Sequence, residues 1–239
     1  MCKPRNILLI FLGTLVATSS KSQIFLGLSS GYSRNYMINN FNKYFIKKVA
    51  PGDGLVYSID AEMYLKEKIS ISLSLMYIQK KYSLVRREPY NEYATKFSNN
   101  YFQLPLKMQF DIPLGNKYYF LLSGGAYIGY WINGYVTGIV PDIFSIDVSE
   151  NEDQIEYYRL VNYQDKYQFN MMKDRRSEFG MVLGTGIGFF VCRNMRIGLG
   201  VEYLGSLTGQ ETGTLLNQKR KVNKTLVTSF GVKCFINNK

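Results

Sequence analysis

The chain has 239 residues, a length that fits one domain, and it contains no histidine. The absence of histidine excludes a Ser-His-Asp triad and most zinc sites. With 29 Lys and Arg against 18 Asp and Glu, the formal net charge is +11, which suits an anionic partner such as nucleic acid or a charged lipid surface.

The first 22 residues have the pattern of a secretory signal peptide. Lys3 and Arg5 form a charged start, an apolar run follows from Ile7 to Val16, and small residues end at Ser22 before a cleavage site at Gln23. We therefore expect residues 1–22 to be removed and residues 23–239 to form a single exported domain. Export favours anionic lipid over nucleic acid as the partner of the positive charge.

Beyond residue 23, apolar and polar side chains alternate in repeated segments, and such alternation predicts β-strands with one apolar and one polar face. The alternation is clearest in 55–66 and in 101–130, where two strands flank a turn marked by Pro113 and Gly115. In chain order, the eight predicted strands are 24–36, 55–66, 69–84, two within 101–130, 177–191, 195–204 and 224–237.

The connections between these strands alternate in length. The short ones are 67–68, 113–117 and 192–194, and the long ones are 37–54, 85–100, 132–176 and 205–223. Outer-membrane barrels combine short periplasmic turns with long outer loops, whereas a soluble sandwich or lipocalin-type barrel has no reason to follow this parity. We therefore predict an all-β fold, an eight-stranded antiparallel up-and-down transmembrane β-barrel in the bacterial outer membrane.

In an eight-stranded barrel the polar strand faces point into a lumen that is only wide enough to be filled by side chains. The charged residues at those positions have both signs, and we predict that they form a charge-paired network: Asp60, Glu62, Lys107, Asp111, Arg196, Glu202 and Lys233. Asp60 and Glu62 alternatively suit acid–base chemistry, although basic lumen residues are available to pair with them. A small conducting pore is the other alternative.

Basic residues gather in or beside the long connections, at the outer end of the predicted barrel. We predict that they form a rim that contacts lipopolysaccharide: Lys80, Lys81, Arg86, Arg87, Lys173, Arg175, Arg176, Lys219, Arg220 and Lys221. Lys and Arg suit the phosphates found at that level, and an ordinary solvated rim is the alternative. The connection 132–176 is long enough to bind a partner.

Three stretches resemble the PorT-like outer-membrane β-barrel family of Bacteroidota. They are YFQLPLK at 101–107, YFLLSGGAYIGY at 119–130 and EFGMVLGTGIG at 178–188. The resemblance implies a small outer-membrane barrel of a Gram-negative bacterium. Most members of that family have no assigned function, and some assist the type IX secretion system.

Outer-membrane barrel proteases, palmitoyl transferases and deacylases depend on a histidine that this chain lacks. We therefore predict a non-enzymatic protein without cofactor or metal, which serves as a structural element or interaction platform through its long outer loops. The alternatives are an accessory component of a type IX-like protein secretion system and a small pore. The predicted partners are outer-membrane lipid, lipopolysaccharide and other envelope or secretion proteins, and not nucleic acid.

Overall fold

The computed structural model describes residues 24–38, 46–86, 94–142, 159–192, 194–211 and 221–236. These residues form nine strands: β1 (Ile24–Ile38), β2 (Ile46–Lys66), β3 (Ile69–Arg86), β4 (Ala94–Pro113), β5 (Tyr118–Asp142), β6 (Arg159–Lys166), β7 (Ser177–Cys192), β8 (Met195–Ser206) and β9 (Val222–Ile236). Among the described residues, no helix is long and apolar enough to cross a membrane.

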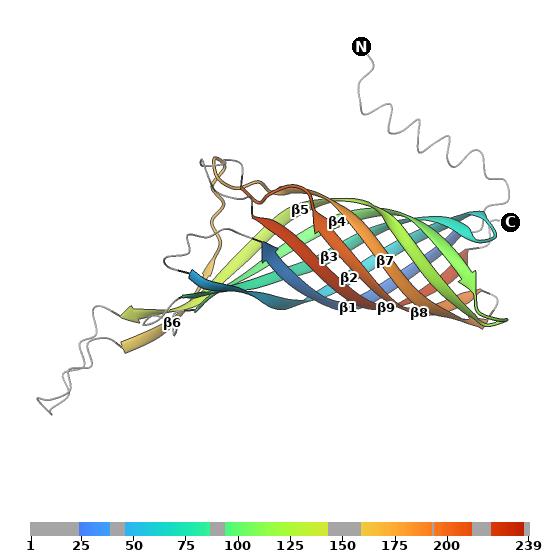
Figure 1. Ribbon diagram of the computed structural model, residues 1–239, viewed down its shortest axis with the longest axis horizontal. Coiled ribbons are helices and arrows are strands. Elements are labelled where there is room, and N and C mark those ends of the chain that lie inside the picture. The colour runs from blue at the N-terminus through green and yellow to red at the C-terminus, as the bar shows by residue number, and fades with distance from the viewer. Residues whose placement is uncertain are drawn as a thin grey trace, which may run out of the picture.

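Eight of the strands close into a ring. Their order is β4-β3-β2-β1-β9-β8-β7-β5, and an additional β4–β5 pairing joins the two ends. Every neighbouring pair is antiparallel. The prediction of an eight-stranded, antiparallel up-and-down barrel is therefore confirmed (Figure 1).

The ninth strand, β6, lies outside the ring, where the sequence predicted only a loop. It pairs with the far end of β5, from Tyr135 to Asp142, beyond the point where β7 begins to pair with the same edge at Tyr130. In Figure 1 this β5–β6 hairpin projects past the end of the barrel. The strands β2, β4 and β5 are also longer than predicted at their outer ends, because pairing continues through segments without apolar–polar alternation.

The short and long connections lie at opposite ends of the barrel. The connections 67–68, 114–117 and 193–194 are short, and the strand ends that lead into the longer connections gather at the other end (Figure 1). Short turns mark the periplasmic end of outer-membrane barrels. The end that carries the β5–β6 hairpin is therefore the outer end.

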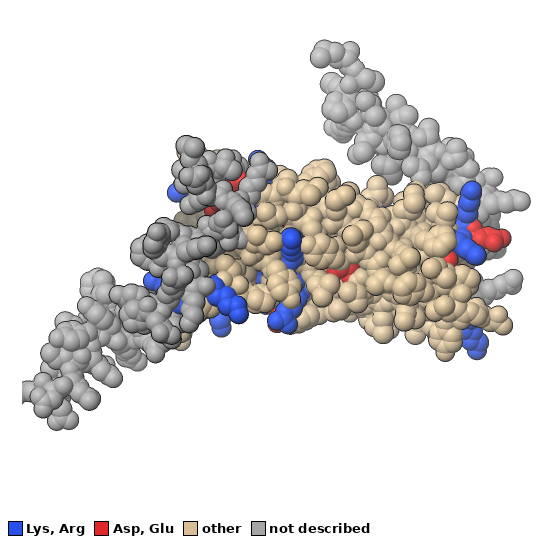
Figure 2. Space-filling view, viewed as in Figure 1, with Lys and Arg blue, Asp and Glu red and all other residues tan. Residues whose placement is uncertain are grey.

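Alternation places apolar side chains outside and polar ones inside, the reverse of a soluble barrel. On β1 and β2, Leu28 and Ile59 are 66% and 56% exposed, whereas the inward Glu62 is 1% exposed. Figure 2 shows a wide band, almost free of charge, between the charged residues at the two ends of the barrel. Such an apolar outer surface is stable only in contact with lipid.

Two glycines allow close packing inside the wall of the barrel. A Cβ at Gly125 of β5 would collide with the backbone carbonyl of Leu106 on β4, and a Cβ at Gly188 of β7 would collide with the ring of Tyr119. These positions therefore require glycine for space, which explains part of the glycine content of β5 and β7.

Candidate functional site

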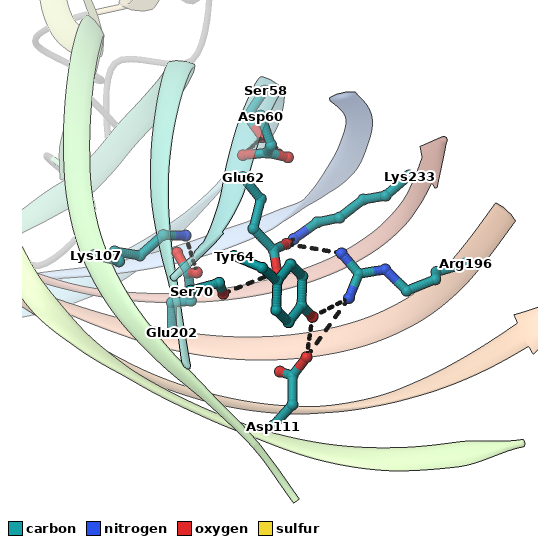
Figure 3. A network of polar contacts seen from close by, with 10 residues as sticks. All are labelled: Ser58, Asp60, Glu62, Tyr64, Ser70, Lys107, Asp111, Arg196, Glu202 and Lys233. Carbon is teal, nitrogen blue, oxygen red and sulfur yellow. Dashed lines mark hydrogen bonds and ion pairs between the residues drawn. The ribbon is translucent and has the colours of Figure 1, made fainter. Parts of the chain in front are cut away.

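Four charged residues and one tyrosine form a cluster inside the periplasmic half of the barrel (Figure 3). Glu62 Oε2 lies 2.6 Å from Lys233 Nζ and 3.1 Å from Arg196 Nη2. Arg196 Nη1 lies 3.6 Å from Asp111 Oδ2 and donates to Tyr64 Oη at 2.6 Å, and the Tyr64 hydroxyl in turn donates to Asp111. These side chains come from β2, β4, β8 and β9, so the cluster ties together opposite walls of the lumen.

Aromatic rings enclose the guanidinium of Arg196, which is 1% exposed. Its Cζ lies 3.9 Å from the centroid of the Phe25 ring, 5.4 Å from that of Tyr64 and 5.6 Å from that of Tyr119. A weakly hydrated, planar cation tolerates this position, because it has two carboxylate neighbours and the faces of the rings attract it. Arg196 and Tyr119 line both a cavity further inside the barrel and a second one beside the periplasmic turns.

A second level of polar contacts lies nearer the middle of the barrel. Lys107 Nζ of β4 is 2.5 Å from Glu202 Oε1 of β8, and both side chains are largely buried. Asp60 is buried as well, and it accepts hydrogen bonds from Ser58 Oγ at 3.1 and 3.0 Å. A cavity of about 100 Å³ lies beside these residues and Arg196, which is room for a few water molecules.

A third level occupies the outer half of the lumen and corrects one sequence prediction. Lys80 was predicted on the outer rim, but its side chain is fully buried inside the barrel, 2.6 Å from Glu178 Oε1. β3 continues to Arg86, so Lys80 lies well below the end of its strand, on the inward face. The hydroxyl of Tyr127 also donates to Glu178, at 2.7 Å.

Aromatic residues cover this third level at the outer mouth. Trp131 stacks on Tyr101 with ring centroids 5.9 Å apart, and on Tyr167 at 5.0 Å, while Phe169 contacts it edge-on at 4.8 Å. Tyr167 and Phe169 belong to the segment 167–176, which joins β6 to β7. Burial and the neighbouring Asp174 carboxylate raise the pKa of the Tyr167 hydroxyl.

Most of the predicted rim residues that the structure describes lie outside the lumen. Arg86, Lys173 and Arg175 are exposed, and Lys81 is half-buried on the outward face of β3. Arg176 is held at the mouth, where Nε and Nη2 donate to the carbonyls of Trp131 and Ile132 at 3.0 Å each. Lys221 forms an ion pair with Glu211. Arg87, Lys219 and Arg220 lie outside the described residues.

Sequence reasoning missed one outward lysine of this rim. Lys96 of β4 is exposed and lies opposite Ser83 of β3, one row from Lys81, which lies opposite Ser98. The sequence placed residue 96 in a loop, because the segment 94–100 has no apolar alternation. The signal that identifies Lys96 is the strand pairing, and this becomes visible only in the structure.

The fold is similar to that of several small outer-membrane barrels. Neisserial surface protein A (NspA) is 11% identical, with 88% of this chain and 96% of that chain covered and a TM-score of 0.48. OprG from Pseudomonas aeruginosa is 10% identical, covering 91% and 96%, also with a TM-score of 0.48. Ail of Yersinia pestis is 11% identical, covering 89% and 98%, with a TM-score of 0.41.

A comparison with curated protein sequences gave no match. The family described as "Outer membrane protein beta-barrel domain" matches residues 17–209, most of the chain, and includes seven of the eight strands that form the ring. This chain is therefore a member of the outer membrane protein beta-barrel domain family, an integral protein of the outer membrane.

Proposed function

We propose that this protein is a closed, non-enzymatic outer-membrane barrel that serves as an interaction platform at the cell surface. The proposal includes a signal peptide, residues 1–22, that directs export of the protein. The observation that carries it is the occupied lumen. Ion pairs cross the lumen at three levels, between Glu62 and both Arg196 and Lys233, between Lys107 and Glu202, and between Lys80 and Glu178.

A closed lumen leaves the outer surface as the part of the molecule that meets partners. The β5–β6 hairpin extends beyond the ring and is held by eight backbone pairings, from Tyr135–Lys166 to Asp142–Arg159. Because β5 is continuous from the periplasmic turn to this hairpin, the platform is rigidly connected to the barrel. A site on a rigid element needs less ordering when a partner binds.

The basic outer rim supports lipopolysaccharide as one partner. Lys81 and Lys96 point away from the lumen near the outer ends of β3 and β4, and Arg86 is exposed at the last position of β3. Lys and Arg at this level suit glycolipid phosphates. Replacing Lys81 and Lys96 by Gln lowers the lipopolysaccharide that copurifies with the barrel, and replacing Lys219, Arg220 and Lys221 by Gln tests the connection before β9 in the same assay. Unchanged lipopolysaccharide in both sets contradicts the rim proposal.

Single-channel recording in planar bilayers tests the closed lumen. The wild-type barrel is expected to show no steady conductance, whereas the double variant Arg196→Ala/Lys107→Ala is expected to leak, because it removes side chains from two of the three levels. The matched control is Arg34→Ala/Lys224→Ala, which removes two cations from the outer face of the barrel. A large, steady wild-type conductance contradicts the proposal and favours a pore.

Affinity purification from native outer membrane separates the platform from an accessory role in a type IX-like secretion system. If the protein is a platform, its partners are expected to be lost when residues 139–162, at the end of the β5–β6 hairpin, are replaced by a short Gly-Ser turn. If it is an accessory component, proteins of the secretion system are expected to copurify with it even after this replacement. Recovery of such components with the shortened variant overturns the platform proposal.

A further inference from the structure

The lipid-facing wall of the barrel contains a groove that crosses five strands. The groove has a volume of about 590 Å³ and apolar walls. Its outer side is a row of rings, formed by Phe230 on β9, Tyr57 on β2, Tyr77 on β3 and Phe102 on β4, which face one another in register. Its periplasmic side is a row of aliphatic side chains, formed by Val232, Leu28, Ile59 and Leu75.

The aromatic row of the groove is interrupted at one position. Ser30 of β1 lies opposite Phe230 on one side and Tyr57 on the other, so it occupies the one position of the row between β9 and β4 that has no ring. The rings beyond the gap are fixed against each other, since Tyr77 and Phe102 pack edge to face with centroids 5.9 Å apart. A small side chain between large ones leaves a permanent notch in the surface.

The dimensions of the groove match one hydrocarbon chain. Four steps between neighbouring strands, at about 4.8 Å each, give a length of roughly 19 Å. The hydrocarbon of one leaflet is roughly 15 Å thick, half of the bilayer core. With strands tilted by about 40°, a groove perpendicular to them rises roughly 12 Å along the membrane normal, so it fits within a single leaflet.

The direction of the groove identifies that leaflet. On β9 the groove begins at Phe230, six residues before the strand's periplasmic end at Ile236, which is about 15 Å along the membrane normal and near the middle of the bilayer. On β4 it ends at Phe102, eleven residues before the periplasmic turn that follows Pro113. The groove therefore rises toward the outer surface as it passes from β9 to β4. Its upper end lies beneath Lys81 and Lys96, which occupy diagonal positions on β3 and β4, about 7–8 Å apart.

We propose that this groove binds one acyl chain of an outer-leaflet glycolipid, while Lys81 and Lys96 bind a phosphate of its headgroup. A lipid held at both ends exchanges more slowly than the surrounding annular lipid, because chain and headgroup must leave together. The headgroup half of the inference rests on the proposed rim, and the acyl-chain half stands on the groove alone. The site gives the barrel a fixed lipid partner on the β1–β4 side.

Native mass spectrometry of the purified, delipidated barrel tests this site, with bisphosphorylated lipid A and phosphatidylethanolamine as separate probes. The wild-type barrel is expected to retain one lipid A. Ser30→Phe completes the aromatic row and fills the notch, so it is expected to lower that retention about tenfold, a difference equivalent to about 1.4 kcal/mol. The matched control is Thr228→Phe, which adds the same ring at an exposed, outward position of β9 that does not line the groove. Heat-modifiable electrophoretic mobility confirms that each variant is folded.

Each outcome decides between the parts of the proposal. Equal retention by wild type, Ser30→Phe and Thr228→Phe overturns the acyl-chain groove. If lipid A is lost from Ser30→Phe but retained by Lys81→Gln/Lys96→Gln, the result supports the acyl-chain groove and contradicts phosphate binding at the rim. Equal retention of phosphatidylethanolamine and lipid A overturns the outer-leaflet source, and a dimer peak that Ser30→Phe removes shows that a second copy of the chain occupies the groove instead.

Discussion

Replacing Lys80 by Met tests whether the ion pairs of the lumen hold the barrel together. Lys80 is fully buried, and its ammonium lies 2.6 Å from Glu178 and 4.8 Å from the centroid of the Tyr101 ring. Methionine keeps much of the volume but leaves the Glu178 carboxylate buried without its cation. Hydrogen bonds from Tyr127 and Asn223 then remain as its polar contacts among the described residues. Removing one partner of a buried pair costs about 3–5 kcal/mol, and we expect a loss of stability in that range.

The assay is denaturant unfolding in phospholipid vesicles, followed through the fluorescence of Trp131, the only tryptophan of the chain. The double variant Lys80→Met/Glu178→Gln removes both charges and is expected to recover most of the loss, because neutral polar groups of the same shape need no counterion. Arg34→Met is the control, since its pairing with Asp53 at 3.9 Å is exposed on the outer face and such pairs contribute at most about 1 kcal/mol. A Lys80→Met barrel within 1 kcal/mol of wild type, or a double variant no more stable than the single one, would refute the reasoning.

Three further predictions follow from the same contacts. Gly125→Ala is expected to lower the free energy of unfolding by about 1–3 kcal/mol, because the added methyl group overpacks against the carbonyl of Leu106. The control is Gly124→Ala, whose methyl group meets only an ordinary 3.5 Å contact, so this variant is expected to stay near wild type in the same unfolding assay. Equal effects of the two substitutions contradict the packing argument. Glu62→Gln leaves the buried Arg196 and the partly buried Lys233 with weaker partners, and we expect a stability loss of about 3 kcal/mol. On gels, the folded form of the variant is expected to disappear at a lower temperature than that of the wild type. Arg176→Ala removes two hydrogen bonds to backbone carbonyls, so proteolysis within 167–176 is expected to become faster while the barrel strands stay resistant. Unchanged cleavage shows that the remaining backbone hydrogen bonds and aromatic contacts hold the segment without this side chain.

Alternation and connection length were enough to predict the ring, because each lipid-facing side chain such as Leu28 must be apolar and each inward one such as Glu62 need not be. The same rule predicted inward positions for Lys107 and Glu202. It could not predict that these two side chains meet. They belong to β4 and β8, which face each other across the lumen without pairing, and the sequence does not show which residues of two unpaired strands lie at the same height. Lys80 was assigned to the rim because it belongs to a basic cluster beside the long connection 85–100. The polar run from Gln79 to Lys81 gives no apolar alternation that would separate the inward side chain from its neighbours.

The origin of the lumen charges in widely separated strands has a consequence for how the barrel is made. Glu62 is on β2, while its two cations, Arg196 and Lys233, are on β8 and β9 and are synthesised last. The ring closes only when β9 pairs with β1, and unpaired charges are costly inside a bilayer. We therefore expect a partly assembled sheet to enter the hydrocarbon poorly until its final strands arrive. Insertion and ring closure are then expected to be coupled, because Glu62, near the start of the chain, gains its two cations only when β8 and β9 are in place.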